Sequence, residues 1–198
     1  MDTYEENNKG KLETYEWDDA WIEFANDAET FRVLYIGDSI SRGIRHIINK
    51  LADGKARIDN FATSKAVDNP YFLKAIELFV NQTNGSDLIL FNNGLHGFHL
   101  NTEEYKKYYE NIVVNLLNDY PKAELKLVLT TYTKRSCDNL KIVNERNHAV
   151  RSIASKHGLE IIDLYAVSYK CQDMLSADGV HMSEDGYNIL AKSILEKF

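Results

Sequence analysis

The sequence predicts an α/β fold in three layers, in which helices cover both faces of a parallel five-stranded sheet. From residue 31 onward, short apolar runs alternate with longer segments whose apolar residues recur every three or four positions. Strands that alternate with helices in this way form parallel sheets buried on both faces. Right-handed crossovers then favour a flavodoxin-like sheet with the strand order 2-1-3-4-5.

The individual elements follow from local patterns. Ile40, Ile44, Ile48 and Leu51 form one apolar stripe and therefore predict a helix. Thr102 is the expected cap of a long helix, and Gly158 is the expected C-cap of a later one. The expected strands are 31–36, 56–61, 87–92, 125–131 and 160–164, and the expected helices are 40–51, 71–81, 102–118, 139–157 and 184–197.

Length and composition indicate one globular domain at 31–198, preceded by a polar lead-in at 1–30 that packs on it. The chain has 198 residues, of which 44% are hydrophobic and 27% charged, so it can bury a core of its own. Trp17 and Trp21 in the lead-in are spaced as on one face of a short helix. A wall of a substrate cleft is the alternative role for this pair.

The charge and the hydropathy of the sequence argue against nucleic-acid and membrane partners, and its N-terminal residues bear on the expected location. The net charge is −7 and no basic stripe is present, which argues against nucleic acid. No apolar run approaches the roughly 20 residues that span a bilayer, so no membrane partner is expected. The acidic N-terminus is unlike a signal peptide. The cytoplasm is therefore the expected location if Met1 is the native start, although a chain trimmed of its leader would look the same.

The loop after the first expected strand carries a candidate nucleophile, Ser39, in the sequence Gly37-Asp38-Ser39-Ile40. A serine between a buried strand and a helix lies at the carboxyl edge of the sheet, where ligands bind in such folds. The N-terminus of the helix favours a developing negative charge at this point. The alternative is that Ser39 only caps the helix.

A second loop, Asp178-Gly179-Val180-His181, comes just before the last expected helix. A serine hydroxyl needs a base that removes its proton, and that base needs a partner that fixes its tautomer. With two residues between them on a turn, the carboxylate of Asp178 can reach the ring of His181. A surface turn is the alternative for this pattern taken alone.

Together the two loops resemble the first and last sequence blocks of the SGNH (GDSL) hydrolase family, over about residues 31–198. The resemblance implies the SGNH hydrolase fold, with Ser39 as nucleophile, His181 as general base and Asp178 as its orienting partner. The GxSxG motif of the α/β-hydrolases is absent.

The middle blocks of the family match less well. The family's oxyanion-binding Gly is missing from the loop at 60–65, where the backbone N–H of Ser64 or a neighbour is the substitute. The family's oxyanion-binding Asn corresponds to His96, with Asn93 as a nearby rival. The string FNNGLHGFH resembles the branch of the superfamily in which GLH occupies this block, close to the PC-esterase-like proteins.

Three further residues are candidate substrate contacts, namely Asp38, Arg42 and His99. Arg42 lies one turn into the first helix, where it could clamp an acidic substrate group or anchor the helix to a neighbouring loop. His99 follows the GLH block and could line the cleft or lie on the loop surface.

No cofactor or metal is expected. The sequence has no HExxH, no Cys/His cluster and no glycine-rich phosphate loop. Cys137 and Cys171 are expected to be reduced thiols, although their sequence positions leave a disulfide open. The sequence does not define an oligomeric state.

The function that follows is hydrolysis of carboxylic esters, such as O-acetyl or short acyl esters of a small molecule or carbohydrate. The acetyl group is implied by the family resemblance alone. An acyltransferase or thioesterase with the same three residues is the alternative enzyme, and a non-catalytic binding domain is the alternative from another class.

Overall fold

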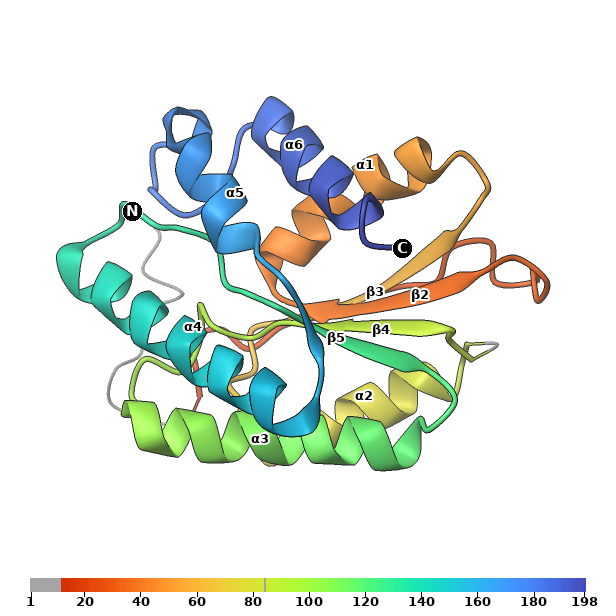
Figure 1. Ribbon diagram of the computed structural model, residues 1–198, viewed down its shortest axis with the longest axis horizontal. Coiled ribbons are helices and arrows are strands. Elements are labelled where there is room, and N and C mark those ends of the chain that lie inside the picture. Colours follow the sequence, from red (N-terminus) through yellow and green to blue (C-terminus); the bar gives the residue numbers. More distant parts are fainter. Residues whose placement is uncertain (1–11, 84) are drawn as a thin grey trace.

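The computed structural model describes residues 12–83 and 85–198, and its centre is a six-stranded sheet with helices on both faces (Figure 1). Five strands are parallel in the order β3-β2-β4-β5-β6, which confirms the predicted order 2-1-3-4-5, and β1 joins β3 antiparallel at the edge. The strands are β1 (Asp18–Trp21), β2 (Arg32–Gly37), β3 (Arg57–Thr63), β4 (Leu88–Phe91), β5 (Glu124–Val128) and β6 (Glu160–Ile162). The helices are α1 (Ser39–Ala52), α2 (Phe72–Val80), α3 (Thr102–Asp119), α4 (Cys137–His157), α5 (Leu164–Lys170) and α6 (Glu184–Leu195), with a 3-10 turn at Gln172–Met174.

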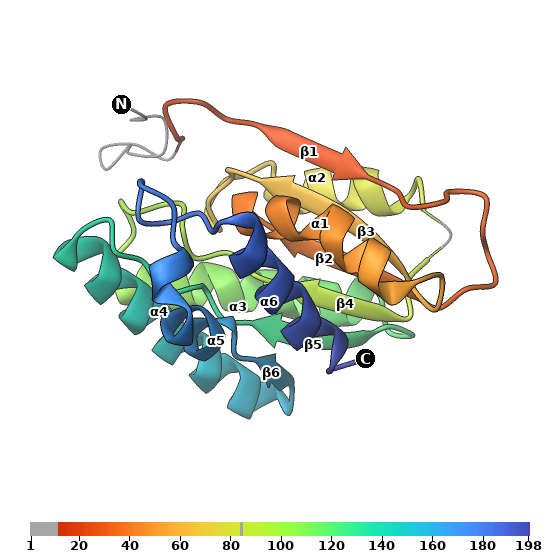
Figure 2. The ribbon, with the colours of Figure 1, turned by 90° about the horizontal axis from the view of Figure 1, so that it is seen from above.

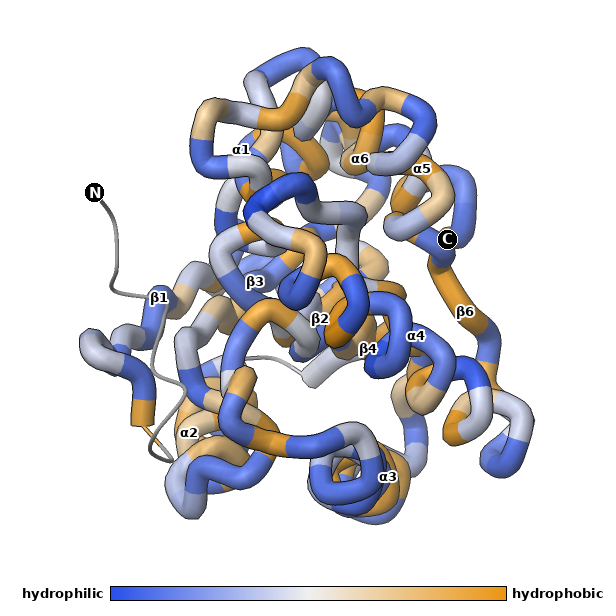
Figure 3. The backbone as a smooth tube through the Cα atoms, turned by 90° about the vertical axis from the view of Figure 1, so that its left-hand side faces the viewer, coloured by the Kyte–Doolittle hydropathy of each residue, from blue (hydrophilic) through white to orange (hydrophobic). Residues whose placement is uncertain are grey.

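The sheet separates two apolar cores. Val33 and Tyr35 of β2 belong to one core, and Leu34 and Ile36 belong to the other. Helices α1, α5 and α6 cover the face of the first core, and α2, α3 and α4 lie on the opposite face (Figures 1 and 2). All four of these side chains are buried because the strand is covered on both faces. In Figure 3 the hydrophobic colours accordingly gather along the central strands, and the hydrophilic colours lie mostly outside.

Two helix predictions need correction. The cap of α3 is Asn101 rather than Thr102, because the Asn101 side chain accepts from the Glu104 N–H (3.0 Å) while the Glu104 carboxylate accepts from the Asn101 N–H (3.1 Å). This reciprocal pair satisfies two N–H groups that a helix start leaves open. Helix α5 was not predicted, since it has only seven residues and shows little periodicity. Gly158 is the C-cap of α4, as predicted.

The predicted helix around Trp17 and Trp21 is wrong, because this segment is the edge strand β1. Asp18 pairs with Thr63 and Trp21 with Asn60, so the segment completes hydrogen bonds along the free edge of β3 (Figure 2). The spacing of the two tryptophans therefore did not reflect a helical face. The proposed lead-in at 1–30 lies partly outside the described residues, and its described part contributes a strand to the sheet.

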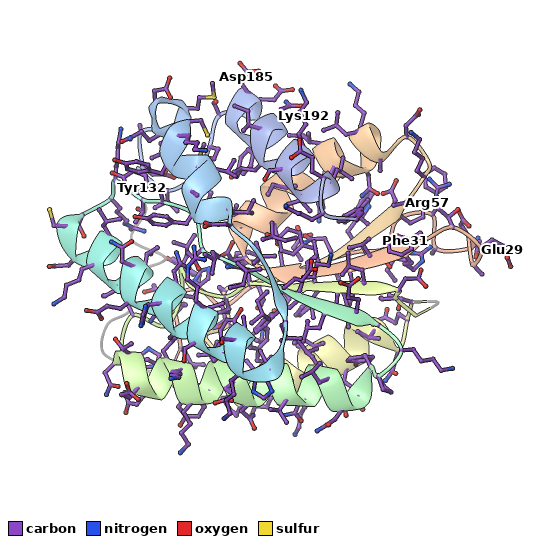
Figure 4. The ribbon with its side chains drawn as sticks, in the orientation of Figure 1. Glu29, Phe31, Arg57, Tyr132, Asp185 and Lys192 are labelled. Carbon is purple, nitrogen blue, oxygen red and sulfur yellow. The ribbon has the colours of Figure 1, made fainter. Side chains whose placement is uncertain are left out.

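The two ends of the sheet differ in what they carry. Figure 4 shows Glu29, Phe31 and Arg57 at the end where the parallel strands begin, and Tyr132, which follows β5, at the opposite end. The loops that follow the parallel strands therefore gather at the end marked by Tyr132, where α/β sheets bind their ligands. None of the described helices is long and apolar enough to cross a membrane.

Candidate active site

Ser39 is the first residue of α1 and follows β2 through a tight turn. The cap of the helix is Asp38, whose carboxylate accepts from the Ile40 N–H at 2.9 Å. A Cβ atom at Gly37 would lie 2.7 Å from Cβ of Ser41, so only glycine allows this close approach. The cap is therefore supplied by Asp38, which leaves the hydroxyl of Ser39 available for another partner.

That partner is His181, from the loop before α6. The Nε2 atom of His181 lies 2.8 Å from Oγ of Ser39, and its Nδ1 atom lies 2.6 Å from Oδ2 of Asp178. A carboxylate only accepts hydrogen bonds, so Nδ1 carries the proton and Nε2 accepts from the Ser39 hydroxyl. The structure thus brings together Ser39, His181 and Asp178 in the order in which a general base and its orienting partner are needed.

The carboxyl group of Asp178 is kept in its charged form. Partial burial acts to raise its pKa, but hydrogen bonds from the His181 ring, the Val180 N–H and the Ser176 hydroxyl together hold the pKa well below its usual range. Asp178 therefore remains a carboxylate under conditions in which an ordinary aspartic acid takes up a proton. Its orientation toward the imidazole is fixed by the same hydrogen bonds.

The loop that carries this pair is tied to the loop after β5. The Gly179 carbonyl accepts from the Lys134 N–H (2.7 Å) and from the Thr133 hydroxyl (2.9 Å). Gly179 has a φ of 72°, in the left-handed region, and an added Cβ would lie 2.8 Å from the Arg135 nitrogen. Glycine is thus required between Asp178 and His181.

Ser39 and His181 both border a pocket of about 440 Å³. The sequence interpretation missed Gly43 and Tyr187 in its lining, although Gly43 lies one helical turn after Ser39. Trp17 lines this pocket, whereas Trp21 lies elsewhere, edge-on to His46, so only Trp17 has the position that the alternative of a cleft wall requires. The residues that line the pocket are Trp17, Ser39, Arg42, Gly43, His181 and Tyr187.

The three predicted substrate contacts have different positions. Asp38 is 1% exposed, caps α1 and is not among the residues that line the Ser39 pocket, so its contact with substrate stays a prediction. His99 is paired with Asp68 at 3.0 Å and does not line the pocket of Ser39. Arg42 does line it, with its guanidinium 5.3 Å from the ring centroid of Trp17.

The predicted backbone donor at Ser64 is not available to an oxyanion. The Ser64 N–H donates to the Trp17 carbonyl at 3.1 Å, which extends the pairing of β1 with β3. The next N–H, of Lys65, donates to the hydroxyl of Thr63 at 3.0 Å. The edge strand, which was not foreseen, is the physical reason why the Ser64 prediction fails.

The two rival side chains of the GLH block are both buried. Asn93 is 0% exposed and its side-chain amide donates to the Lys65 carbonyl at 2.8 Å. His96 is 1% exposed, and its ring meets the edge of Trp17 with 6.3 Å between centroids. His96 thus contacts Trp17, which lines the Ser39 pocket, whereas the amide of Asn93 is bonded to the neighbouring loop.

Two charged residues that the sequence interpretation missed hold the GLH loop in place. The Arg146 guanidinium, which is buried, donates to the carbonyls of His96 (2.6 Å) and Gly97 (2.6 Å) and also to that of Gly94. The carboxylate of Glu13 accepts from the Gly97 N–H at 2.8 Å and lies 3.7 Å from Nδ1 of His96. An arginine inside the helical stripe of α4 was the available signal, because a buried charge needs local partners.

The described residues also show how the cysteines and the acidic and histidine side chains are arranged. Within 12–83 and 85–198, no group of three or more His, Cys, Asp or Glu side chains is arranged to hold a metal ion. Cys137 and Cys171 are both free thiols, the first exposed and the second buried.

Comparisons with known proteins show the fold. The sequence matches no protein-family model and no curated protein. The structure is similar to that of an acetyl xylan esterase, with 17% identity, 84% of this chain and 99% of that chain covered, and a TM-score of 0.67. It is also similar to a lipolytic G-D-S-L family protein from Veillonella parvula (19% identity, 85% and 98% covered, TM-score 0.67) and to an acetylxylan esterase from Geobacillus stearothermophilus (16% identity, 84% and 93% covered, TM-score 0.64).

The class that these findings define is the α/β fold of the GDSL esterases, so the predicted resemblance is confirmed at the level of the fold. The aligned parts cover nearly the whole of the similar proteins, which means that no large part of their fold is missing from this chain.

Proposed function

We propose that this protein is a serine-dependent carboxylic ester hydrolase. The observation that carries the proposal is the chain of hydrogen bonds from Ser39 to His181 to Asp178 at the border of a pocket. The two structural alternatives are a helix cap at Ser39 and a surface turn at Asp178 and His181. A helix cap would involve Ser39 without His181, and a surface turn would involve Asp178 and His181 without Ser39. The contact between two loops separated by 142 residues serves neither of these structural purposes.

The geometry supports a two-step mechanism. Oγ of Ser39 attacks the ester carbonyl as its proton passes to Nε2 of His181, and the resulting imidazolium is stabilised by the carboxylate of Asp178. His181 then gives this proton to the departing alcohol, which leaves an acyl group on Ser39. Water, activated by His181 in the same way, releases the acid and restores the hydroxyl.

An O-acetyl ester of a carbohydrate or small molecule is the proposed substrate class. The support is the fold, since two of the similar structures are acetyl xylan esterases. The pocket itself is bordered by both aromatic and polar side chains, Trp17, Tyr187 and Arg42, which suits a polar alcohol better than a long lipid chain.

The test is to label the protein with a fluorophosphonate, which reacts with activated serine hydroxyls, and to find the modified peptide by mass spectrometry. We expect the label on Ser39, together with hydrolysis of acetylated sugars and short aryl esters. The matched control is Ser155→Ala, which alters an exposed serine on α4 and is expected to label normally. Adding an alcohol acceptor separates hydrolysis from acyl transfer. The proposal would be contradicted if the protein neither reacted with the fluorophosphonate nor hydrolysed any of the acetylated sugars and short aryl esters.

A further prediction concerns the developing oxyanion, for which we propose the Ser39 N–H and the His96 side chain as donors. Such a donor acts as the tetrahedral intermediate forms, so its loss lowers kcat more than it changes KM. We expect His96→Ala to lower kcat about 10²–10³-fold, which is typical for one donor. We expect His96→Asn to recover part of the rate, because the amide can donate in the same direction.

Asn93→Ala is the control for this assignment. Steady-state kinetics of the three variants, with circular dichroism to check folding, distinguish the outcomes. If Asn93→Ala causes the whole loss while His96→Ala is silent, Asn93 is the donor and the GLH block is aligned incorrectly. If neither change lowers kcat, the GLH loop serves only to support the pocket.

A further inference from the structure

The pocket beside Ser39 contains a cationic group that serves no evident structural purpose. Arg42 lies one helical turn after Ser39 on α1, so both side chains lie on the same face of the helix. Its guanidinium contacts the ring of Trp17, but this contact uses none of its five N–H donors. Within 12–83 and 85–198, the Arg42 side chain forms no hydrogen bond or ion pair.

Arg45, one turn further along α1, shows what an arginine with a structural role looks like here. Its guanidinium also stacks on a tryptophan of the N-terminal segment, Trp21, at 5.0 Å, but it is paired with the carboxylate of Asp19 as well. Arg45 therefore anchors β1 to α1 and does not line the pocket. The corresponding prediction for Arg42, that it anchors the helix to a neighbouring loop, lacks a hydrogen-bonding partner on any loop that the structure describes.

The Trp17 ring that the Arg42 guanidinium contacts belongs to a segment that is hydrogen-bonded to the sheet. The backbone N–H of Trp17 donates to the Ser64 hydroxyl at 2.8 Å, and the backbone carbonyl of Trp17 accepts from the Ser64 N–H at 3.1 Å. The backbone that carries the Trp17 ring is thereby tied to Ser64, the residue that follows β3. A guanidinium held in this way loses less freedom when it binds an anion, which increases affinity.

On this basis, and resting on the proposed ester hydrolase function, we propose that the alcohol part of the substrate bears a carboxylate that Arg42 binds. A planar guanidinium with free N–H groups binds carboxylates through two parallel hydrogen bonds. The alcohol side follows from the mechanism. His181 must reach the oxygen of the leaving alcohol to protonate it, and His181 and Arg42 line the same pocket. The substrate class is therefore the ester of a hydroxy acid, such as an acetylated acidic sugar.

The test compares two acetyl esters that differ only in charge on the alcohol side, para-acetoxybenzoate and para-acetoxybenzamide. Each kcat/KM is divided by the rate of the same ester with hydroxide, which removes the difference in intrinsic reactivity. We expect wild type to prefer the benzoate, and Arg42→Gln to lower the benzoate-to-benzamide ratio about 10- to 100-fold, mainly through KM, as for loss of a charged hydrogen bond. Arg45→Gln is the matched control and is expected to keep the wild-type ratio.

Binding of the two product alcohols, para-hydroxybenzoate and para-hydroxybenzamide, to the Ser39→Ala protein gives a second readout by calorimetry. It separates the subsite from the proposed function, because it requires no turnover. If para-hydroxybenzoate binds more tightly than para-hydroxybenzamide, and if adding Arg42→Gln to the Ser39→Ala protein abolishes this difference, the subsite is supported even when no ester is cleaved. If the benzoate-to-benzamide ratio is equal in wild type and Arg42→Gln, and both product alcohols bind equally well, the proposed carboxylate subsite is overturned. A preference instead for an anionic acyl group, measured with para-nitrophenyl hemiglutarate against the pentanoate, would overturn the assignment to the alcohol side.

Discussion

Replacing Ser39 with alanine is expected to lower kcat for ester hydrolysis by roughly 10⁴–10⁶-fold, the range found when a member of such a catalytic unit is removed. The loss is large because no acyl group can be transferred to the chain without its hydroxyl. Folding is expected to persist, since Asp38 rather than Ser39 caps α1 and alanine is a favourable helix residue. The measurements are kcat, fluorophosphonate labelling and the thermal unfolding temperature.

The cap offers a contrasting variant. Asp38→Ala removes the side chain that accepts from the Ile40 N–H, and such a loss typically costs about 1 kcal/mol of stability. We therefore expect Ser39→Ala to remove activity at nearly unchanged stability and Asp38→Ala to lower the unfolding temperature. Near-normal turnover by a folded Ser39→Ala protein would show that the nucleophile lies elsewhere.

The sheet could be predicted because its strands are buried on both faces. Val33 to Ile36 and Leu88 to Phe91 are short continuous apolar runs, as is typical of central parallel strands. The edge strand β1 has the opposite character, since its residues DDAW are mostly exposed and half of them are acidic. Its stability comes from pairing with β3, a distant partner that no local pattern reveals.

The candidate site divides in the same way. Ser39, Asp178 and His181 could be identified because their chemistry requires particular side chains at strand ends. The backbone donors and the residues that support the site could not be identified from the sequence. The Ser64 N–H is used by the Trp17 carbonyl, and Arg146 acts through carbonyls 49–52 residues away, which depends on tertiary contacts alone. The capping role of Asp38 was not predicted, because capping a helix and contacting a substrate use the same residue type.

The second large effect is expected at the base. His181→Ala should lower kcat roughly 10⁴–10⁶-fold, because the Ser39 hydroxyl then has no acceptor for its proton. The matched control is His157→Ala on α4, which removes another histidine paired with a carboxylate, that of Glu110 at 2.7 Å. Neither His157 nor Glu110 lines the pocket. We expect this control to keep its activity. Comparable rates for His181→Ala and wild type would identify a different base.

Asp178→Asn tests how the base is held. The asparagine amide can donate to Nδ1, which favours the tautomer with the proton on Nε2, and Nε2 then cannot accept from Ser39. The equivalent change in a serine protease lowers kcat about 10⁴-fold, and we expect a loss of similar or somewhat smaller size here. The double variant Ser39→Ala/His181→Ala completes the test. If the three residues act as one unit, the double variant should be no slower than either single variant, because each single change already removes the pathway. A double variant whose loss equals the product of the single losses would mean that Ser39 and His181 act independently, and their hydrogen bond would then not be the basis of catalysis.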